Sequence, residues 1–313
     1  MNPQEFYSAL SANISKVIKG KDREIKLVIA ALCAKGHVLL EDVPGTGKTV
    51  LAKAIAKSIG GDFARIQFTP DLLPSDITGI NFFNMKSQEF TLRKGPVFTN
   101  ILLADEINRA TPRTQSALLE CMEERQATID GESYSLPAPF AVIATENPVE
   151  TQGTYPLPEA QLDRFLIRLS LGYSDRESEI EILSGFGAVH PLEKTETVVS
   201  AEDLLNVQNE ICSVNVNEAV KGYLADLAAA TRKDTRIRLG ISTRGLLALM
   251  RMSQSIAAIE GRAYVIPDDI KLCAPYVMCH RIICRERGIN GSNADGIVSD
   301  ILENVPVPTE NID

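Results

Sequence analysis

A short segment between an apolar run and a helix-forming stretch has the residues of a phosphate-binding loop. The segment follows Val38–Leu40 and reads Glu41-Asp42-Val43-Pro44-Gly45-Thr46-Gly47-Lys48-Thr49-Val50. Backbone N–H groups of such a loop and of the helix after it point toward a bound anion. We expect Val43–Val50 to contact the phosphates, with Lys48 reaching the β- and γ-phosphates and the Thr49 hydroxyl coordinating Mg²⁺. The segment therefore predicts a P-loop that binds a nucleoside triphosphate, most simply ATP, with Mg²⁺.

One position departs from the general P-loop pattern, which has glycine where this chain has Asp42. Aspartate is among the few residues besides glycine that adopt left-handed backbone angles. We therefore expect Asp42 to have such angles, with its carboxylate directed away from the phosphates. The alternative is a plain Gly-Pro turn before a helix, which Lys48 and Thr49 in register behind a strand disfavour.

An acidic pair, Asp105-Glu106, ends the apolar run that begins at Ile101. In parallel sheets, polar residues at the carboxyl end of a central strand lie beside the ligand site. We expect Asp105 to hold the Mg²⁺ shell and Glu106 to polarise the attacking water, a role typically worth ~10²–10⁴-fold in rate. A solvated acidic strand end is the alternative, and the P-loop upstream disfavours it.

Three further polar residues are candidates for the same chemistry. Asn147 ends the next apolar run and can bond the water or the γ-phosphate without adding negative charge; it can also be a turn residue before Pro148. Arg164 either pairs with Asp163 or acts as an arginine finger toward the nucleotide of a neighbouring subunit, worth roughly 10³–10⁵-fold. Arg244 opens a predicted helix and either places a cation on the phosphates or faces solvent.

These residues need a framework of alternating strands and helices. Apolar runs predict strands at 37–41, 63–68, 101–105, 140–145 and 165–169. Helical spacing predicts helices at 6–18, 24–34, 48–59 and 112–124, and then at 175–185, 201–212, 217–231, 243–259 and 267–275. The alternation indicates an α/β nucleotide-binding core with a parallel sheet over residues 1–172 and an all-helical domain over 173–313.

Two stretches interrupt the alternation and are predicted to be insertions. Residues 70–96 contain proline, glycine and two extended runs, Asn81–Asn84 and Glu89–Leu92. Residues 126–136 are predicted to form a hairpin that turns at Asp130-Gly131, a dipeptide typical of tight turns.

The composition narrows the class of protein. With 313 residues and a net charge of −9, the chain is long enough for two domains and lacks the basic character of a free-standing nucleic-acid binder. No apolar run has the length of a membrane span, and the N-terminus lacks signal-peptide features, so we expect a cytoplasmic protein without membrane insertion. Cys279, His280 and Cys284 are close enough for a metal site, but reduced thiols on apolar segments are the favoured interpretation.

The ordered set of motifs resembles the AAA+ ATPases, and specifically the MoxR family. The matching segments are Walker A at 41–49, Walker B at 102–110, sensor 1 at 144–148, the arginine-finger region at 159–165 and sensor 2 at 240–245. Val17-Ile18-Lys19-Gly20 resembles the segment that lines the adenine pocket in that superfamily, which implicates Val17, Ile18 and Gly20. The resemblance covers nearly the whole chain. Asp42 departs from the general Walker A pattern, and Thr243 stands where the family often has proline.

The resemblance implies a homo-oligomeric ring, a hexamer, with ATP at the subunit interfaces. Residues 70–96 resemble the helix-2 insert and residues 126–136 the hairpin before sensor 1, both of which project toward the pore of related rings. The family implies a chaperone that remodels a protein client, commonly one with a von Willebrand factor A domain, in metal insertion or complex maturation.

Two other functions stay open. One is a DNA motor, although the tips of the two insertions, 84–89 and 129–133, carry one lysine against three acidic residues, and a DNA grip needs basic side chains. The other is a nucleotide-gated binding module with little hydrolysis, which the presence of Glu106, Asn147, Arg164 and Arg244 disfavours.

Overall fold

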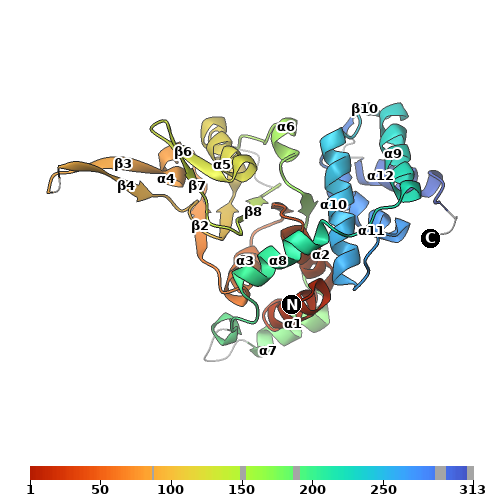
Figure 1. Cartoon of the computed structure of the whole chain (residues 1–313), viewed down its shortest axis with the longest axis horizontal. Coiled ribbons are helices and arrows are strands. Elements are labelled where there is room, and N and C mark those ends of the chain that lie inside the picture. Colours follow the sequence, from red (N-terminus) through yellow and green to blue (C-terminus); the bar gives the residue numbers. More distant parts are fainter. Residues whose placement is uncertain (87, 149–152, 186–190, 286–293, 309–313) are drawn as a thin grey trace.

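A parallel five-stranded sheet in the order β2-β5-β8-β1-β9 forms the centre of the first part of the molecule (Figure 1). The structure is a computed structural model that describes residues 1–308 except 87, 149–152, 186–190 and 286–293. The strands are β1 (Val38–Glu41), β2 (Phe63–Gln67), β5 (Ile101–Asp105), β8 (Ala141–Glu146) and β9 (Ile167–Leu169). All five predicted strands are confirmed, and all pair in parallel.

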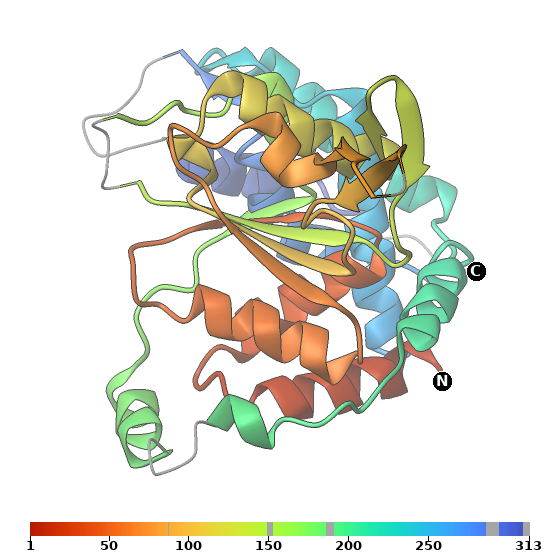
Figure 2. The same ribbon diagram turned by 90° about the vertical axis from the view of Figure 1, so that its left-hand side faces the viewer.

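The sheet is covered on both faces, which explains why its three inner strands, β5, β8 and β1, are almost continuously apolar. Val38 and Leu40 of β1 pack into one cluster with helices α1 (Pro3–Ile14), α2 (Asp22–Cys33) and α3 (Lys48–Ser58). Leu39 points to the opposite face and packs into a second cluster with α5 (Pro112–Glu124). Figure 2 shows α1 and α3 on one side of the sheet and α5 on the other. The helices packed on both faces hold each strand in place and so determine where its last residue lies.

Both predicted insertions are antiparallel hairpins. Strands β3 (Gly79–Asn84) and β4 (Glu89–Lys94) form an arm that projects from the body (Figure 1), and a short helix that the sequence did not predict, α4 (Pro74–Thr78), precedes it. Strands β6 (Gln126–Ile129) and β7 (Glu132–Ser135) turn at Asp130 and Gly131, both with positive φ, as the Asp-Gly dipeptide indicated.

After β9 the residues that the structure describes form mainly helices, with a small β-ladder as an exception. The longer helices are α7 (Arg176–Gly185), α8 (Ala201–Ile211), α9 (Glu218–Lys233), α10 (Thr243–Ile259), α11 (Pro267–Met278) and α12 (Ala294–Asn304). A 3-10 helix spans Pro191–Lys194, and two short helices lie within the sheet-containing part: the 3-10 helix Ile107–Arg109 and α6 (Glu159–Leu162). The exception is a two-stranded ladder of β10 (Ile237–Leu239) and β11 (Ile283–Cys284), which the expectation of helices alone had missed. The domain boundary at residue 172 stays a prediction.

Helix α11 extends past Pro275, where the sequence analysis ended it. Proline removes one intrahelical hydrogen bond, but the buried side chains of Ala274, Val277 and Met278 hold the last turn in the core. No helix in the described ranges is both long and apolar enough to cross a membrane.

Candidate nucleotide site

The predicted P-loop lies between β1 and α3. Gly45 and Gly47 have φ of 91° and 89°, angles that other residues rarely adopt, and Gly47 directly precedes the first residue of α3, Lys48. The Lys48 ammonium donates to the backbone oxygens of Asp42 at 2.9 Å and Val43 at 3.4 Å, so its head lies over the loop. The loop thus combines a helix N-terminus and a lysine at the carboxyl edge of the sheet, an arrangement that suits phosphate.

The expected backbone of Asp42 is wrong, and its side chain points toward the segment that follows β9. Asp42 is absent from the described non-glycine residues with positive φ, so it does not replace glycine for conformational reasons. Its carboxylate is buried and accepts hydrogen bonds from Ser170 Oγ at 2.7 Å, Leu171 N at 2.7 Å and Gly172 N at 3.0 Å. We call these contacts the Asp42 clip. The clip ties the start of the P-loop to the chain that leaves β9.

A cavity of about 440 Å³ adjoins the loop. Six of the residues predicted to bind the nucleotide line it: Val17, Ile18, Gly45, Thr46, Gly47 and Val50. Val43, Pro44, Lys48 and Thr49 belong to the same loop but do not line the cavity. Sequence reasoning missed the lining residue Glu179 of α7 and, in addition, the apolar lining residues Tyr173, Ile182 and Leu183. Their apolar side chains suit a flat purine ring, yet no motif marks them in the sequence.

Gly20 does not line this cavity. Its φ is +66°, and a Cβ atom there would lie 2.1 Å from Ser178 Oγ in α7. Gly20 therefore allows the segment after α1 to contact α7 closely, which brings Val17 and Ile18 to the cavity wall.

Asp105 and Glu106 lie at the carboxyl edge of the sheet, as predicted. Asp105 Oδ1 accepts from Thr145 Oγ1 at 2.7 Å, and its Oδ2 accepts from Arg65 Nη2 at 2.6 Å and Nε at 3.2 Å. Thr145 Oγ1 also accepts from Glu106 N at 2.8 Å. Sequence reasoning missed both Thr145 and Arg65, because each belongs to a strand that is distant in sequence.

Glu106 has a left-handed backbone, with φ of 57°, a conformation that costs a non-glycine residue roughly 1 kcal/mol. Its Oε2 accepts from Gln67 Nε2 at 2.8 Å and lies 3.1 Å from Arg109 Nε. Gln67, the last residue of β2, therefore holds the carboxylate of Glu106 from the neighbouring strand.

Asn147 directly follows β8 and is buried. Its neighbour Glu146 is paired in register with Glu41 of β1. Burial raises the pKa of Glu146 to about 7, Glu41 adds to the increase, and Arg168 opposes it. An acidic group that titrates near neutrality therefore lies between the P-loop and Asn147.

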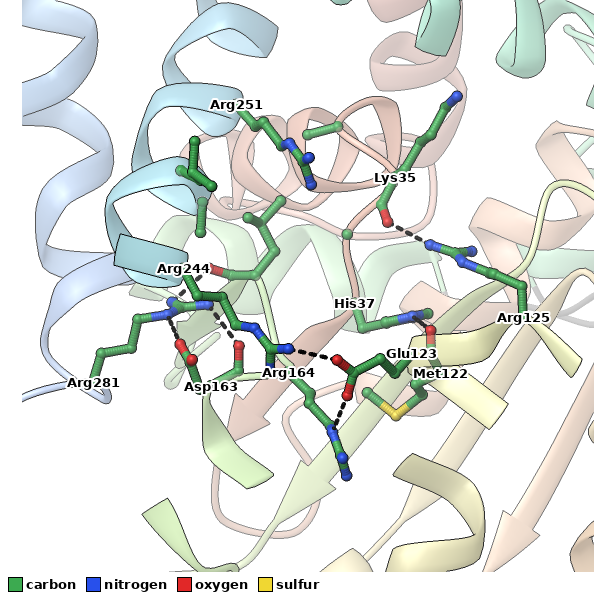
Figure 3. Close-up of a pocket in the computed structure, with 15 residues that line it drawn as sticks. Lys35, His37, Met122, Glu123, Arg125, Asp163, Arg164, Arg244, Arg251 and Arg281 are labelled. Atoms are coloured by element: carbon green, nitrogen blue, oxygen red, sulfur yellow. Dashed lines mark hydrogen bonds and ion pairs between the residues drawn. The ribbon is translucent and has the colours of Figure 1, made fainter. Parts of the chain in front are cut away.

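Arg164 and Arg244 meet at one carboxylate (Figure 3). Arg164 Nε lies 2.7 Å from Glu123 Oε2, and Arg244 Nη2 lies 2.5 Å from Glu123 Oε1. Burial pushes the pKa of Glu123 up, but the two arginines outweigh it, so the net shift is downward. No sequence pattern indicates Glu123, which is the penultimate residue of α5. Arg164 thus pairs with Glu123 and not with Asp163. The side chain of Arg244 is 55% exposed, so it faces solvent as one of the two interpretations expected, and it also pairs with Glu123.

These residues line a second cavity, of about 450 Å³, which we call the arginine pocket. Its basic residues are Lys35, Arg125, Arg164, Arg244, Arg251 and Arg281, and its acidic residues are Glu123 and Asp163. Lys35 and His37 precede β1, so the pocket lies at the amino edge of the sheet, opposite the P-loop. From His37 to Asp42 the strand rises about 17 Å, at roughly 3.3 Å per residue.

The suggested metal site at Cys279, His280 and Cys284 is not formed. His280 is buried, its Nε2 lies 3.1 Å from the backbone oxygen of Phe165, and burial lowers its pKa well below the usual range. No group of three or more metal-ligating side chains occurs among the residues that the structure describes.

The family models match both parts of the chain. Residues 37–167 match the "ATPase family associated with various cellular activities (AAA)", and residues 229–301 match the "AAA lid domain". The sheet, the loop and the acidic pair therefore belong to an AAA-type ATPase with a helical lid.

The relatives define a narrower branch. Chaperone MoxR1 of Mycobacterium tuberculosis is 39% identical over 95% of this chain and 81% of its own length. YeaC of Bacillus subtilis is 50% identical over 95% of this chain and 93% of its own length. A crystal structure from Cytophaga hutchinsonii has a TM-score of 0.88 at 40% identity and covers 98% of this chain and 97% of its own. The chain belongs to the MoxR family of AAA+ ATPases.

Proposed function

We propose that the chain hydrolyses ATP at the interface between two copies of itself. The observation that carries this proposal is the position of the arginine pocket. Arg164 and Arg244 lie at the amino edge of the sheet, whereas the P-loop lies at the carboxyl edge. The intervening strand is about 17 Å long, more than an arginine side chain can span, so neither arginine reaches its own P-loop. In this proposal both serve the nucleotide of a neighbouring copy.

The residues at the carboxyl edge perform the rest of the reaction. Lys48 holds the β- and γ-phosphates, and Glu106, oriented by Gln67, polarises the attacking water. Asn147 donates to the water or the γ-phosphate. The neighbour's Arg164 and Arg244 then neutralise the charge that develops on the transferred phosphoryl group.

The oxygen ligands at this edge fit Mg²⁺. Thr49 offers a hydroxyl, and Asp105 offers a carboxylate whose Oδ1 accepts a single bond, from Thr145. An ionised carboxylate has about four acceptor sites, so Oδ1 can still accept from a water of the Mg²⁺ shell while Arg65 occupies Oδ2. Bound Mg²⁺ supplies charge neutralisation at the β- and γ-phosphate oxygens.

The client in this proposal is a protein. The arm formed by β3 and β4 carries exposed apolar side chains: Ile80, Phe82, Phe83, Met85 and Phe90. The rings of Phe83 and Phe90 pack edge-to-face with their centroids 5.4 Å apart. Such an apolar surface suits contact with polypeptide rather than with phosphate. From the family resemblance we extend the proposal to a hexameric ring and to a client with a von Willebrand factor A domain, in metal insertion or complex maturation.

The test is steady-state phosphate release with Mg-ATP over a series of protein concentrations. We expect the activity per subunit to rise with concentration and to vanish in Lys48→Ala. Glu106→Gln and Arg164→Ala should each be inactive but should recover activity when mixed, because some interfaces then combine two intact halves. A mixture that stays inactive, with mixed assembly confirmed, would contradict the placement of Arg164 in the neighbour's site.

A further inference from the structure

One lid residue has an unusually complete set of contacts to the segment that carries Arg164. Arg281 follows α11, and its side chain is only 3% exposed. Its Nε lies 2.6 Å from Asp163 Oδ1, and its Nη2 donates to the backbone oxygens of Asp163 at 3.1 Å and Phe165 at 2.6 Å. Its Nη1 donates to the backbone oxygen of Leu166 at 3.1 Å. The guanidinium therefore binds the backbone on both sides of Arg164.

The remaining contacts anchor the same guanidinium in the lid. Nη1 also donates to the backbone oxygen of Val277 at 2.6 Å and lies 2.7 Å from His280 Nε2. Burying a charge costs several kcal/mol, and an apolar residue of similar volume often replaces a buried ion pair without loss of stability. General packing therefore does not explain why arginine occupies position 281. What its flat, forked head provides is a fixed geometry for the turn that it binds.

The stem of Arg281 contacts the second catalytic arginine's helix. A Cβ atom at Gly245 would lie 2.8 Å from Arg281 Cδ, so the first turn of α10 packs directly against the stem. Gly245 follows Arg244, and its N–H donates to Ser242 Oγ at 3.1 Å in the cap of the helix. One side chain thus contacts the backbone beside both arginines, while Glu123 joins their heads (Figure 3).

We propose that Arg281 is the positioning residue that holds Arg164 and Arg244 as one unit. This inference rests on the proposed function, in which both arginines act on the neighbour's nucleotide. Arg281 belongs to the lid and Arg164 to the core, so a rotation of the lid must either break the Arg281 contacts or carry the turn of Arg164 with it. Arg281 therefore couples the position of the lid to the activity of the adjacent site.

The first test is Arg281→Lys. Lysine keeps the charge and the stem but cannot form the fork of hydrogen bonds to three backbone oxygens. Because misplacement of a catalytic group by about 1 Å costs roughly 100-fold, we expect ATP turnover to fall by about that factor. ATP affinity should stay within about twofold, since the P-loop is untouched. Asp163→Asn, which keeps an acceptor at Oδ1, should show a smaller loss of the same kind and serves if Arg281→Lys does not fold.

The matched control is Arg262→Lys. Arg262 is a lid arginine whose side chain is 23% exposed, and it donates to Asp269 at 2.8 and 2.6 Å and to the backbone oxygen of Tyr264 at 3.1 Å. None of these contacts involves Arg164 or Arg244. The Arg262→Lys variant should lose thermal stability as Arg281→Lys does, but its ATP turnover should stay unchanged. Equal losses of turnover in the two variants would overturn the proposal, because they would show that the effect is general destabilisation.

Mixing experiments separate positioning from other defects. Arg281→Lys subunits should recover activity when mixed with Glu106→Gln, which supplies intact arginines, but not when mixed with Arg164→Ala, which has the same defect. If Arg164→Ala recovers with Glu106→Gln and Arg281→Lys does not, the positioning role is overturned and the proposed function stands. If neither recovers, the placement of the arginines in the neighbour's site fails, and the role of Arg281 fails with it.

Discussion

Replacing Asp42 with glycine should lower the free energy of unfolding, although glycine is the residue that the general P-loop pattern has at this position. The substitution removes the carboxylate that accepts the hydrogen bonds of the Asp42 clip, so the N–H groups of Leu171 and Gly172 lose this acceptor. A hydrogen bond to a charged group contributes about 1.5–3 kcal/mol, and the three bonds are not additive. We therefore expect a loss of about 3–5 kcal/mol in the free energy of unfolding.

The assay is thermal unfolding of Asp42→Gly and Asp42→Asn beside the unmodified chain. At roughly 2–4 °C per kcal/mol, Asp42→Gly should lower Tm by about 10 °C. Asparagine keeps one oxygen that can accept from Leu171 N, so the Tm of Asp42→Asn should lie between those of Asp42→Gly and the unmodified chain. If Asp42→Gly unfolds within about 1 °C of the unmodified chain, the clip contributes nothing and our account of the aspartate is wrong.

Two other substitutions test the site through stability. Glu146→Gln should stabilise the fold by about 3 kcal/mol at pH 8 and by less than about 1 kcal/mol at pH 5. The pKa of Glu146 is about 7 in the folded chain and 4.5 in the unfolded chain, so the unmodified protein loses stability as the pH rises from 4.5 through 7. An equal gain at pH 5 and pH 8, measured by thermal unfolding, would contradict this account. Gly20→Ala should lower Tm more than Gly131→Ala. Both glycines have positive φ, but of the two only Gly20 has a neighbour, Ser178, within reach of an added Cβ atom. Equal decreases in Tm would show that backbone strain alone accounts for the effect.

Much of the nucleotide site could be predicted because its determinants are local. Gly45, Gly47, Lys48 and Thr49 fall within one turn, and the register of a strand before a helix fixes where they point. Asp105 and Asn147 follow apolar runs, so a parallel sheet must bring both to one edge. The family comparison confirms this framework, and the roles of the individual residues stay predictions.

The missing parts depend on contacts between distant segments. Glu123 is 41 residues from Arg164 and 121 residues from Arg244, and no local pattern in α5 distinguishes it from an ordinary surface glutamate. The mistaken backbone of Asp42 has the same origin, because local propensity suggested a left-handed residue while its real partners lie about 130 residues away. Strands β10 and β11 are too short to show periodicity, and they are stabilised by their pairing and by the burial of Ile237 in the core.

The placement of the P-loop and the arginine pocket at opposite edges of one sheet restricts the symmetry of any active assembly. A surface that meets its own copy across a two-fold axis completes both ATP sites only if that one surface contains the P-loop and the arginine pocket together. Where the two edges instead meet head to tail, the contacts are heterologous, and every open row of subunits ends with one unmatched P-loop and one unmatched arginine pocket. Such a row loses both unmatched ends only when its subunits close into a ring. One copy with a defective P-loop or a defective arginine pocket then leaves one ATP site of that ring incomplete.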